Sequence, residues 1–317
     1  MNRPDGAFIS VIVVTKGAGD YISRCLRSLD AQTLPPAEVI VIDNSLDSGF
    51  SRKLKCDFPK VAVYESPVNL FYAASLNKGV FISRGEYILC LNDDVVLDAN
   101  FISEASRGFF AGKNIGMVSG KVFRDDAETI DSVGIRPDIF RRAKEKGYGK
   151  AAGKSFEKEA FIFGPGGAAA FYRKKMLEDI KYDCQYFDED LIMFYEDLDA
   201  AWRGRNYGWR GYYVPSAAAY HIRGGSFRPD AGLNKPFARR YLDNKMHAWL
   251  IKNRYIVMLK NESAAGLILH IVPALLFGLL ELAYAFFCRR QVIRALKGHY
   301  WIRRALAKRK YCFPSRY

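Results

Sequence analysis

Short runs of branched apolar residues alternate with helix-type spacing through the first third of this chain. The apolar runs occupy residues 8–14, 39–42, 61–64 and 87–91. Between them, apolar side chains recur at helical spacing over residues 21–29, and a second helical stretch runs from about Tyr72 to Gly85. This strand–helix–strand alternation predicts a mostly parallel, doubly wound α/β sheet with helices on both faces.

Polar residues follow several of these apolar runs directly. Thr15 follows the first run, Asp43 follows the second, and Asp93 and Asp94 come just after the fourth. The carboxyl ends of parallel strands meet at one edge of a doubly wound sheet, and ligands bind outside that edge. We therefore expect these side chains to lie along one ligand-binding rim.

Asp93 and Asp94 are candidates for holding a divalent cation. Mg²⁺ and Mn²⁺ prefer oxygen ligands and are usually bound by one or two carboxylates together with substrate phosphates. A cation there would stabilise the negative charge that develops on a departing diphosphate. Aspartates after a strand also form simple turns, and the preceding Asn92 does not decide between the two interpretations.

A second acidic cluster, Glu196, Asp197 and Asp199, opens a predicted helix over residues 196–206. Acidic residues in a first helical turn are favoured by the helix dipole, which explains one or two of them without any function. A carboxylate near a reacting centre can also take a proton from an attacking hydroxyl. His221 lies downstream and can offer an imidazole nitrogen to a metal, although a lone histidine is more often a surface or core residue.

Small residues gather at Gly166 and Gly167, after the apolar residues 161–163 and Pro165. Glycines allow the backbone to come close to a ligand, but they also serve tight turns with no further role. The polar residues 124–160, which precede this turn, are predicted to be a long surface excursion. A short strand is predicted over residues 212–214, ending before Pro215.

The C-terminal part of the chain combines an apolar segment with a basic tail. Residues 264–287 are almost wholly apolar and contain Pro273, and residues 289–317 hold ten Lys or Arg and no acid, in a chain of net charge +14. Spanning a bilayer takes about 20 uninterrupted apolar residues. We expect a helix or helical hairpin in the membrane interface, beside anionic head groups. A buried core helix and a solubilising tail are the alternatives.

Taken in order, these motifs resemble those of family 2 glycosyltransferases with the GT-A (Rossmann-like) fold, and most of all the rhamnosyltransferase-like members. The resemblance covers roughly residues 8–260. It is carried by Ser10-Val11-Ile12-Val13-Val14-Thr15, Val41-Ile42-Asp43-Asn44-Ser45, Leu91-Asn92-Asp93-Asp94-Val95, and Phe194-Tyr195-Glu196-Asp197-Leu198-Asp199 followed by Pro215 and His221. Segment 69–79 also matches a family pattern, except that Phe71 replaces a glycine.

The resemblance implies a role for each matching residue. Asp197 would be the catalytic base, and Asp94 and His221 would hold the divalent cation, Mg²⁺ or Mn²⁺. The donor would be bound by Thr15, Asp43, Asn69 and Asp93. The acceptor would be bound by Gly166, Gly167, Glu196 and Asp199.

The implied reaction is a single displacement with inversion at the anomeric carbon. The favoured donor is dTDP-rhamnose, followed by UDP-hexoses and UDP-galactofuranose, and the acceptor is a saccharide or a lipid-linked saccharide of cell-surface polysaccharide synthesis. The implied organisation is a catalytic domain over residues 1–235 and a membrane-associating helical region over 236–317. The enzyme would associate peripherally with the cytoplasmic face of the plasma (inner) membrane.

Other classes of protein fit the sequence less well. A nucleotidyltransferase also uses carboxylate-held metal, but residues 16–19 are too short for a phosphate-binding loop of the G-x-x-x-x-G-K type. A nucleic-acid-binding protein is disfavoured because the positive charge gathers beside an apolar segment, without interleaved aromatic residues. An inactive glycosyltransferase-like scaffold is disfavoured by the intact acidic pair and His221. We therefore expect no nucleic-acid partner.

Overall fold

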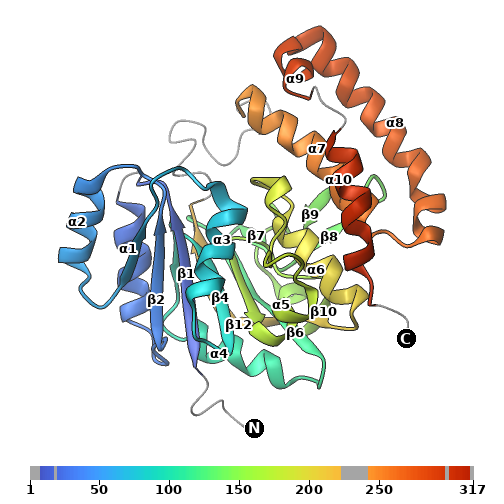
Figure 1. The fold of residues 1–317 in the computed structure, drawn as a ribbon. Helices are drawn as coiled ribbons and strands as arrows, with labels where there is room; N and C mark the ends of the chain where they lie inside the picture. Colours follow the sequence, from blue (N-terminus) through green and yellow to red (C-terminus); the bar gives the residue numbers. More distant parts are fainter. Residues whose placement is uncertain (1–7, 18–19, 223–241, 297–299, 315–317) are drawn as a thin grey trace.

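The computed structural model describes residues 8–17, 20–222, 242–296 and 300–314. Its strands are β1 Ile9–Thr15, β2 Glu38–Asp43, β3 Ala62–Glu65, β4 Tyr87–Asn92, β5 Val95–Leu97, β6 Ile115–Arg124, β7 Ile130–Ser132, β8 Ile135–Pro137, β9 Ala143–Glu145, β10 Ala160–Ile162, β11 Ala169–Arg173 and β12 Arg210–His221. A ten-stranded sheet forms the centre (Figure 1), with the main strand order β10-β12-β6-β11-β4-β1-β2-β3. Strands β8 and β9 pair separately.

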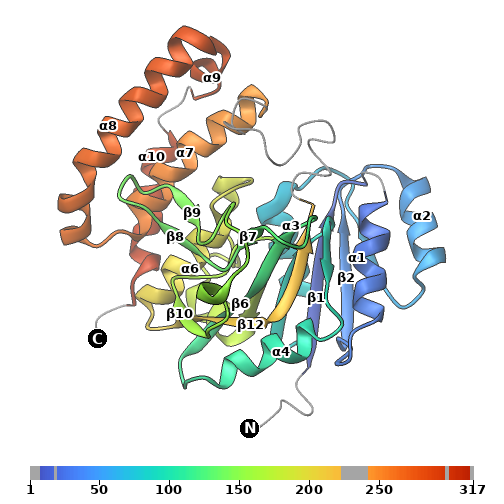
Figure 2. The same ribbon diagram turned by 180° about the vertical axis from the view of Figure 1, so that it is seen from behind.

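The α-helices are α1 Tyr21–Asp30, α2 Ser48–Asp57, α3 Phe71–Ile82, α4 Phe101–Arg107, α5 Lys174–Ile180, α6 Glu196–Asn206, α7 Asn244–Asn261, α8 Ala264–Cys288, α9 Arg290–Ala295 and α10 Tyr300–Lys308. Short 3-10 helices cover Gly108–Phe110, Lys154–Phe156, Glu189–Leu191 and Arg309–Cys312. Apolar residues of α1, α2 and α4 share one core with one side of the sheet (Figure 2), and those of α3, α5 and α6 share another core with the opposite side. The predicted α/β sheet with helices on both faces is confirmed.

The four predicted N-terminal strands all form. Strand β1 pairs in parallel with β2 and β4, and β2 pairs in parallel with β3. Most apolar residues of β1, β2 and β4 are buried on both faces of the sheet, as expected of a sheet covered by helices on each side, whereas the edge strand β3 is more exposed. The register sets Thr15 opposite Asp43 and Val14 opposite Asn92, so the polar residues after these strands do lie at one edge.

Two sequence-based expectations for the second half of the sheet are wrong. The strand predicted to end before Pro215 continues to His221, because a register shift between Tyr213 and Ala218 accommodates the proline without ending the pairing with β6. The segment 124–160 is not wholly a surface excursion. Strand β7 is completely buried and pairs with β6, which carries Asp131 into the interior.

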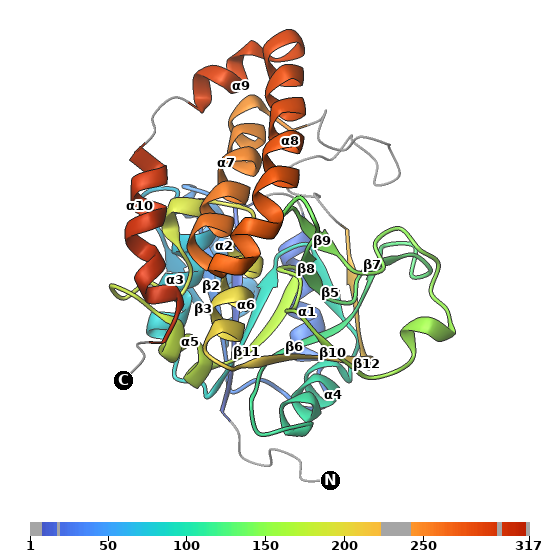
Figure 3. The same cartoon turned by 90° about the vertical axis from the view of Figure 1, so that its right-hand side faces the viewer.

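The C-terminal helices pack against the sheet domain, with α7 lying between α8 and α10 (Figure 3). A buried ion-pair cluster joins the two parts: Lys260 on α7 pairs with Asp188 and with Asp199 at 2.9 Å, and Lys308 on α10 pairs with Asp188 at 2.5 Å. Burial alone would raise the pKa of Asp188, but the charges of the two lysines hold it well below its usual value. The predicted domain boundary at 235/236 lies outside the described residues.

Candidate active site

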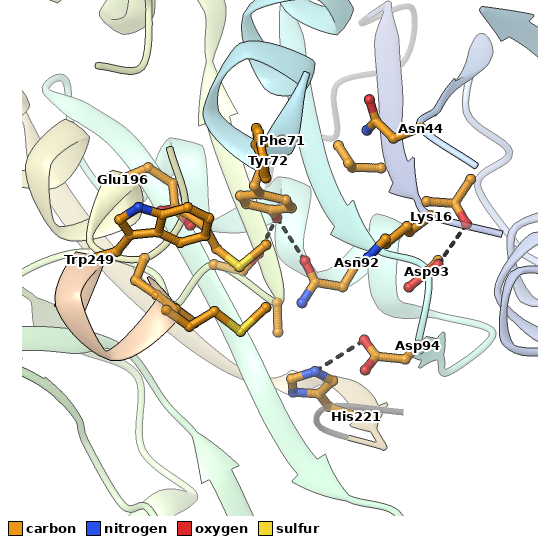
Figure 4. A pocket seen from close by; sticks show the side chains of 18 of the residues that line it. Lys16, Asn44, Phe71, Tyr72, Asn92, Asp93, Asp94, Glu196, His221 and Trp249 are labelled. Atoms are coloured by element: carbon orange, nitrogen blue, oxygen red, sulfur yellow. Dashed lines mark hydrogen bonds and ion pairs between the residues drawn. The ribbon is translucent and has the colours of Figure 1, made fainter. Parts of the chain in front are cut away.

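A cavity of about 520 Å³ opens at the carboxyl edge of the sheet (Figure 4). Strands β1, β4 and β7, the end of β12, the 166–168 turn and the start of α6 all contribute to it, and α7 closes one side. Of the residues predicted to form the site, eight line the cavity: Thr15, Asn69, Asp93, Asp94, Gly166, Gly167, Glu196 and His221.

The acidic pair after β4 points into one end of the cavity. The hydroxyl of Thr15 donates a hydrogen bond to Asp93 Oδ2 at 2.7 Å and accepts one from the backbone N–H of Gly17 at 3.0 Å. Asp94 Oδ1 lies 3.2 Å from Nε2 of His221. His221 reaches this position because β12 pairs with β5, the short strand that follows the acidic pair, and sets His221 opposite Val95.

Asp131 is the site residue that the sequence did not reveal. Its Oδ2 lies 2.8 Å from Nδ1 of His221, on the side of the ring opposite Asp94, and Asp131 is almost fully buried. Burial alone would lower the pKa of His221, but hydrogen bonds to Asp131 and Asp94 and their negative charges raise it to about 9. No motif marks Asp131, because it lies in the polar segment 124–160.

The residues at this end fit a divalent cation of the Mg²⁺ or Mn²⁺ type. Asp94 would contribute carboxylate oxygen, and Nε2 of His221 would become a ligand when the cation replaces its ring proton. Asp131 fixes the other ring nitrogen, as partners of metal-bound histidines commonly do. Within the described parts of the chain, three or more His, Cys, Asp or Glu side chains nowhere converge as a complete metal cage.

Glu196 and Asp197 lie at the opposite end, at the start of α6. Glu196 is almost fully buried and lines the cavity, and burial together with the charge of neighbouring Asp197 raises its pKa to about 8. Asp197 lies just behind the cavity wall. Its carboxylate accepts hydrogen bonds from the backbone N–H groups of Gly167 at 2.8 Å and of Leu198 at 2.7 Å.

The expectation that Asp199 shapes the acceptor pocket is wrong. Its side chain is fully buried and does not line the cavity. One oxygen accepts from Arg203 Nε at 3.0 Å, and the other lies near Lys260 and accepts from Asn261. Asp199 therefore belongs to the buried ion-pair cluster with the C-terminal helices, whereas Glu196, one turn earlier, lines the cavity.

Asp43 also stands back from the cavity. Its carboxylate accepts hydrogen bonds from the backbone N–H of Ser45 at 2.7 Å and from the hydroxyl of Ser51, so it closes the turn after β2. The neighbouring Asn44 lines the cavity instead, and its Oδ1 accepts from the N–H of Leu70. The nucleotide contact expected of Asp43 stays a prediction.

Further cavity residues come from α3 and α7. Tyr72 places its hydroxyl 2.7 Å from Asn92 Oδ1 and 3.1 Å from the carbonyl of Gly167, which links the two ends of the cavity. Trp249 packs edge-on against Phe71, the residue that replaces the glycine of the family pattern, with ring centroids 5.5 Å apart. The helix α7 therefore belongs to the site as well as to the C-terminal region.

A doubly wound sheet with nucleotide-edge threonine, paired carboxylates and a histidine defines a nucleotide-dependent α/β enzyme. The model of the family "Glycosyl transferase family 2" matches residues 10–181, which is more than half of the 317 residues. The chain belongs to glycosyl transferase family 2 and is a glycosyltransferase.

Curated relatives include rhamnosyltransferases, as the motifs indicated. The chain is 24% identical to N-acetylglucosaminyl-diphospho-decaprenol L-rhamnosyltransferase of Mycobacterium tuberculosis over 249 residues, which cover 67% of this chain and 75% of that protein. It is 23% identical to poly-beta-1,6-N-acetyl-D-glucosamine synthase of Staphylococcus epidermidis over 222 residues, 68% of this chain and 50% of that protein.

Solved structures of low sequence identity share the fold. The mannosyltransferase of Pyrobaculum calidifontis in complex with GDP-Man and Mn²⁺ matches with a TM-score of 0.56 and 17% identity over 96% of this chain and 85% of that one. GalNAc-T7 with UDP, GalNAc and Mn²⁺ matches with a TM-score of 0.60 and 14% identity over 80% of this chain and 48% of that one. The predicted GT-A fold is confirmed.

Proposed function

We propose that this protein is a metal-dependent, inverting glycosyltransferase that uses a nucleotide-diphosphate sugar. The observation that carries the proposal is the cavity itself. Asp94 and His221 lie at one end and Glu196 at the other, with Asp197 directly behind Gly167. A leaving diphosphate and an attacking hydroxyl thus have separate, chemically suited ends of one space.

At the donor end, Thr15, Asp93 and Asn69 contact the nucleotide sugar, while Asp94 and Nε2 of His221 hold a divalent cation. When bound, the cation neutralises the charge that builds on the departing diphosphate, so that the protein needs no acid there. Asp131 keeps the imidazole oriented toward Asp94. The solved complexes of two structural neighbours with Mn²⁺ support the choice of ion.

At the acceptor end we assign the general base to Asp197. The attacking hydroxyl forms its bond to the anomeric carbon and transfers its proton to this carboxylate, while the bond to the diphosphate breaks on the opposite face. Two backbone N–H donors, of Gly167 and Leu198, hold the carboxylate of Asp197 in place. Glu196, with a pKa of about 8, holds a proton at neutral pH and can donate a hydrogen bond to the acceptor.

The name of the mycobacterial relative supports dTDP-rhamnose as donor and a lipid-linked saccharide as acceptor. UDP-hexoses and UDP-galactofuranose are the further donor candidates. A structural neighbour solved with UDP-GlcNAc supports uridine-diphosphate sugars as a donor class. We place the reaction in the synthesis of cell-surface polysaccharide, at the cytoplasmic face of the plasma (inner) membrane.

The helix α8 supports peripheral membrane association. In the described part of the chain it is the one helix long and apolar enough to cross a membrane, and only 17% of its most apolar window is buried. This low burial favours membrane contact over a buried core helix. An interfacial position is favoured over a span because Glu281 of α8 pairs with Arg254 of α7 at 2.8 Å, and Glu262 just before α8 pairs with Arg141 at 2.5 Å. These contacts tie α8 to α7 and its start to the β8–β9 turn.

The test of the proposal is a donor screen followed by a transfer assay. We expect one nucleotide sugar with Mn²⁺ or Mg²⁺ to raise the melting temperature of the protein, and Asp94→Asn to abolish that shift. Asp197→Asn should keep the shift and lose transfer. The matched control is Asp126→Asn, an exposed aspartate outside the cavity. Transfer by the Asp197→Asn enzyme would refute the assignment of the base.

A further inference from the structure

The cavity has two unlike ends, and one wall near Glu196 is apolar. Five side chains form this wall, which we call the apolar wall: Phe71, Met193, Phe194, Met246 and Trp249. Figure 4 places Trp249 and Phe71 across the cavity from Asp94 and His221. Methionine and aromatic side chains supply large, adaptable apolar surfaces but few hydrogen-bonding groups. A ligand at this wall is therefore held by apolar contact.

The segment that carries Met193 and Phe194 is fixed in place by α7. Nδ2 of Asn253 lies 2.8 Å from the carbonyl oxygens of Leu191 and Met193 and 2.9 Å from that of Phe194. Asn253 is fully buried. Phe194 has a φ of 72°, a left-handed conformation that a non-glycine residue adopts only at a cost. The surrounding contacts thus impose this arrangement of the wall.

The start of α7 is joined to helices α8 and α9. Leu242 lines the cavity, and its carbonyl accepts a hydrogen bond from Arg289 at the end of α8 at 2.7 Å. Asn244, the first residue of α7, donates to Gln291 on α9 at 2.5 Å. Close to this junction, Phe287 at the end of α8 leaves 78% of its side chain exposed. The apolar wall and the exposed apolar surface of α8 thus belong to helices that are joined at the start of α7.

We propose that the apolar wall receives the first part of the hydrocarbon chain of a lipid-linked acceptor, which enters from a bilayer beside the α8–α9 corner. This inference rests on the proposed function, because it names the part of the acceptor that the same cavity holds. The hydrocarbon lies against Trp249 and Met246, while the sugar hydroxyl of the acceptor reaches Glu196 and Asp197.

A binding experiment tests the proposal without requiring turnover. Farnesyl diphosphate serves as the probe, titrated calorimetrically into the full-length protein with saturating inorganic diphosphate, so that binding through the head group alone is competed away. We expect Trp249→Ala to weaken binding at least about tenfold and Trp249→Tyr to restore most of it, since an aromatic face is retained. Phe161→Ala, at an exposed aromatic on β10 outside the cavity, should bind like the wild type.

Two results would overturn the proposal. One is farnesyl diphosphate binding that is absent in the wild type or equal in wild type and Trp249→Ala. The other is competition by soluble N-acetylglucosamine with the same sensitivity to Trp249→Ala, which would assign the wall to sugar stacking. Failure of the proposed function is measured separately, as the absence of any thermal shift with nucleotide sugar and Mn²⁺ in the wild-type protein.

Discussion

Replacing Glu196 with glutamine is expected to stabilise the protein, and to do so more strongly as the pH rises. Glu196 is 6% exposed, and among the described residues its Oε2 has no hydrogen-bond partner. Burial and the charge of Asp197 raise its pKa to about 8 from the ordinary 4.5. At neutral pH the folded protein must therefore keep a proton on Glu196 that the unfolded chain has already released.

The size of this stabilisation follows from the difference between the pKa values of Glu196 in the folded and unfolded states. Below the unfolded pKa both states are protonated and the group costs nothing, whereas between the two pKa values the folded state becomes progressively less stable as pH rises. A pH of about 7 lies about 2.5 pH units above the unfolded pKa, so keeping Glu196 protonated lowers the free energy of unfolding by about 3 kcal/mol at that pH. Glutamine keeps the shape without titrating, so Glu196→Gln should gain about 2 to 3 kcal/mol at that pH and nothing at about pH 4.

The assay is urea denaturation of both proteins across about pH 4 to pH 8, with Glu128→Gln as an exposed control. The expected result is a difference in unfolding free energy that grows through this range and levels off near the folded pKa. A difference that stays constant with pH, or a less stable glutamine variant at neutral pH, would refute the buried, protonated state of Glu196.

Three further predictions concern the cation, the fold and the membrane. Asp131→Asn removes the acceptor that orients the imidazole, and calorimetry should show Mn²⁺ binding weakened about 10- to 100-fold; unchanged affinity would count against it. Lys260→Met leaves Asp188 buried with one cation fewer and should lower the unfolding free energy by about 3 to 5 kcal/mol, whereas a loss under about 1 kcal/mol would contradict the cluster's role. Leu269→Gln and Leu280→Gln, at positions each 70% exposed, remove apolar surface without adding charge and should reduce flotation with anionic vesicles without unfolding the protein; undiminished flotation would place the anchor elsewhere.

The cluster around Lys260 also changes how membrane association should be tested. Truncation after Lys260 removes α8 but also Lys308, which pairs with Asp188 in the core between the domains. The shortened protein would lose stability as well as its apolar helix. Surface substitutions on α8 separate these two effects, because the altered side chains face solvent and make no contact with the ion-pair cluster.

The parts of the site that the sequence predicted are those tied to strand ends. An apolar run followed by a polar residue defines both a strand and its edge, so the positions of Thr15, Asp93 and Asp94 follow from local pattern alone. His221 joined them on the strength of the family resemblance. Its actual route to Asp94, a strand continuing past Pro215, depended on a register shift that no local pattern reveals.

The remaining parts depend on contacts between distant segments. Asp131 is separated from His221 by 90 residues and lies in a stretch whose composition indicates surface. Trp249 meets Phe71 only because α7 folds back over the carboxyl edge of the sheet. Asp199 was assigned to the acceptor pocket with its neighbours, yet its buried partners Arg203 and Lys260 determine that it is structural.

Sugar transfer measured with and without cation tests the central claim most directly. The enzyme is incubated with dTDP-rhamnose and the other candidate nucleotide sugars, Mn²⁺ and a polyprenyl-diphosphate-linked N-acetylglucosamine, and the glycosylated lipid is detected by mass spectrometry. We predict a product whose new linkage has the inverted anomeric configuration, and which disappears with a chelator or with Asp94→Asn. A product of retained configuration, or transfer that persists in both controls, would contradict the account.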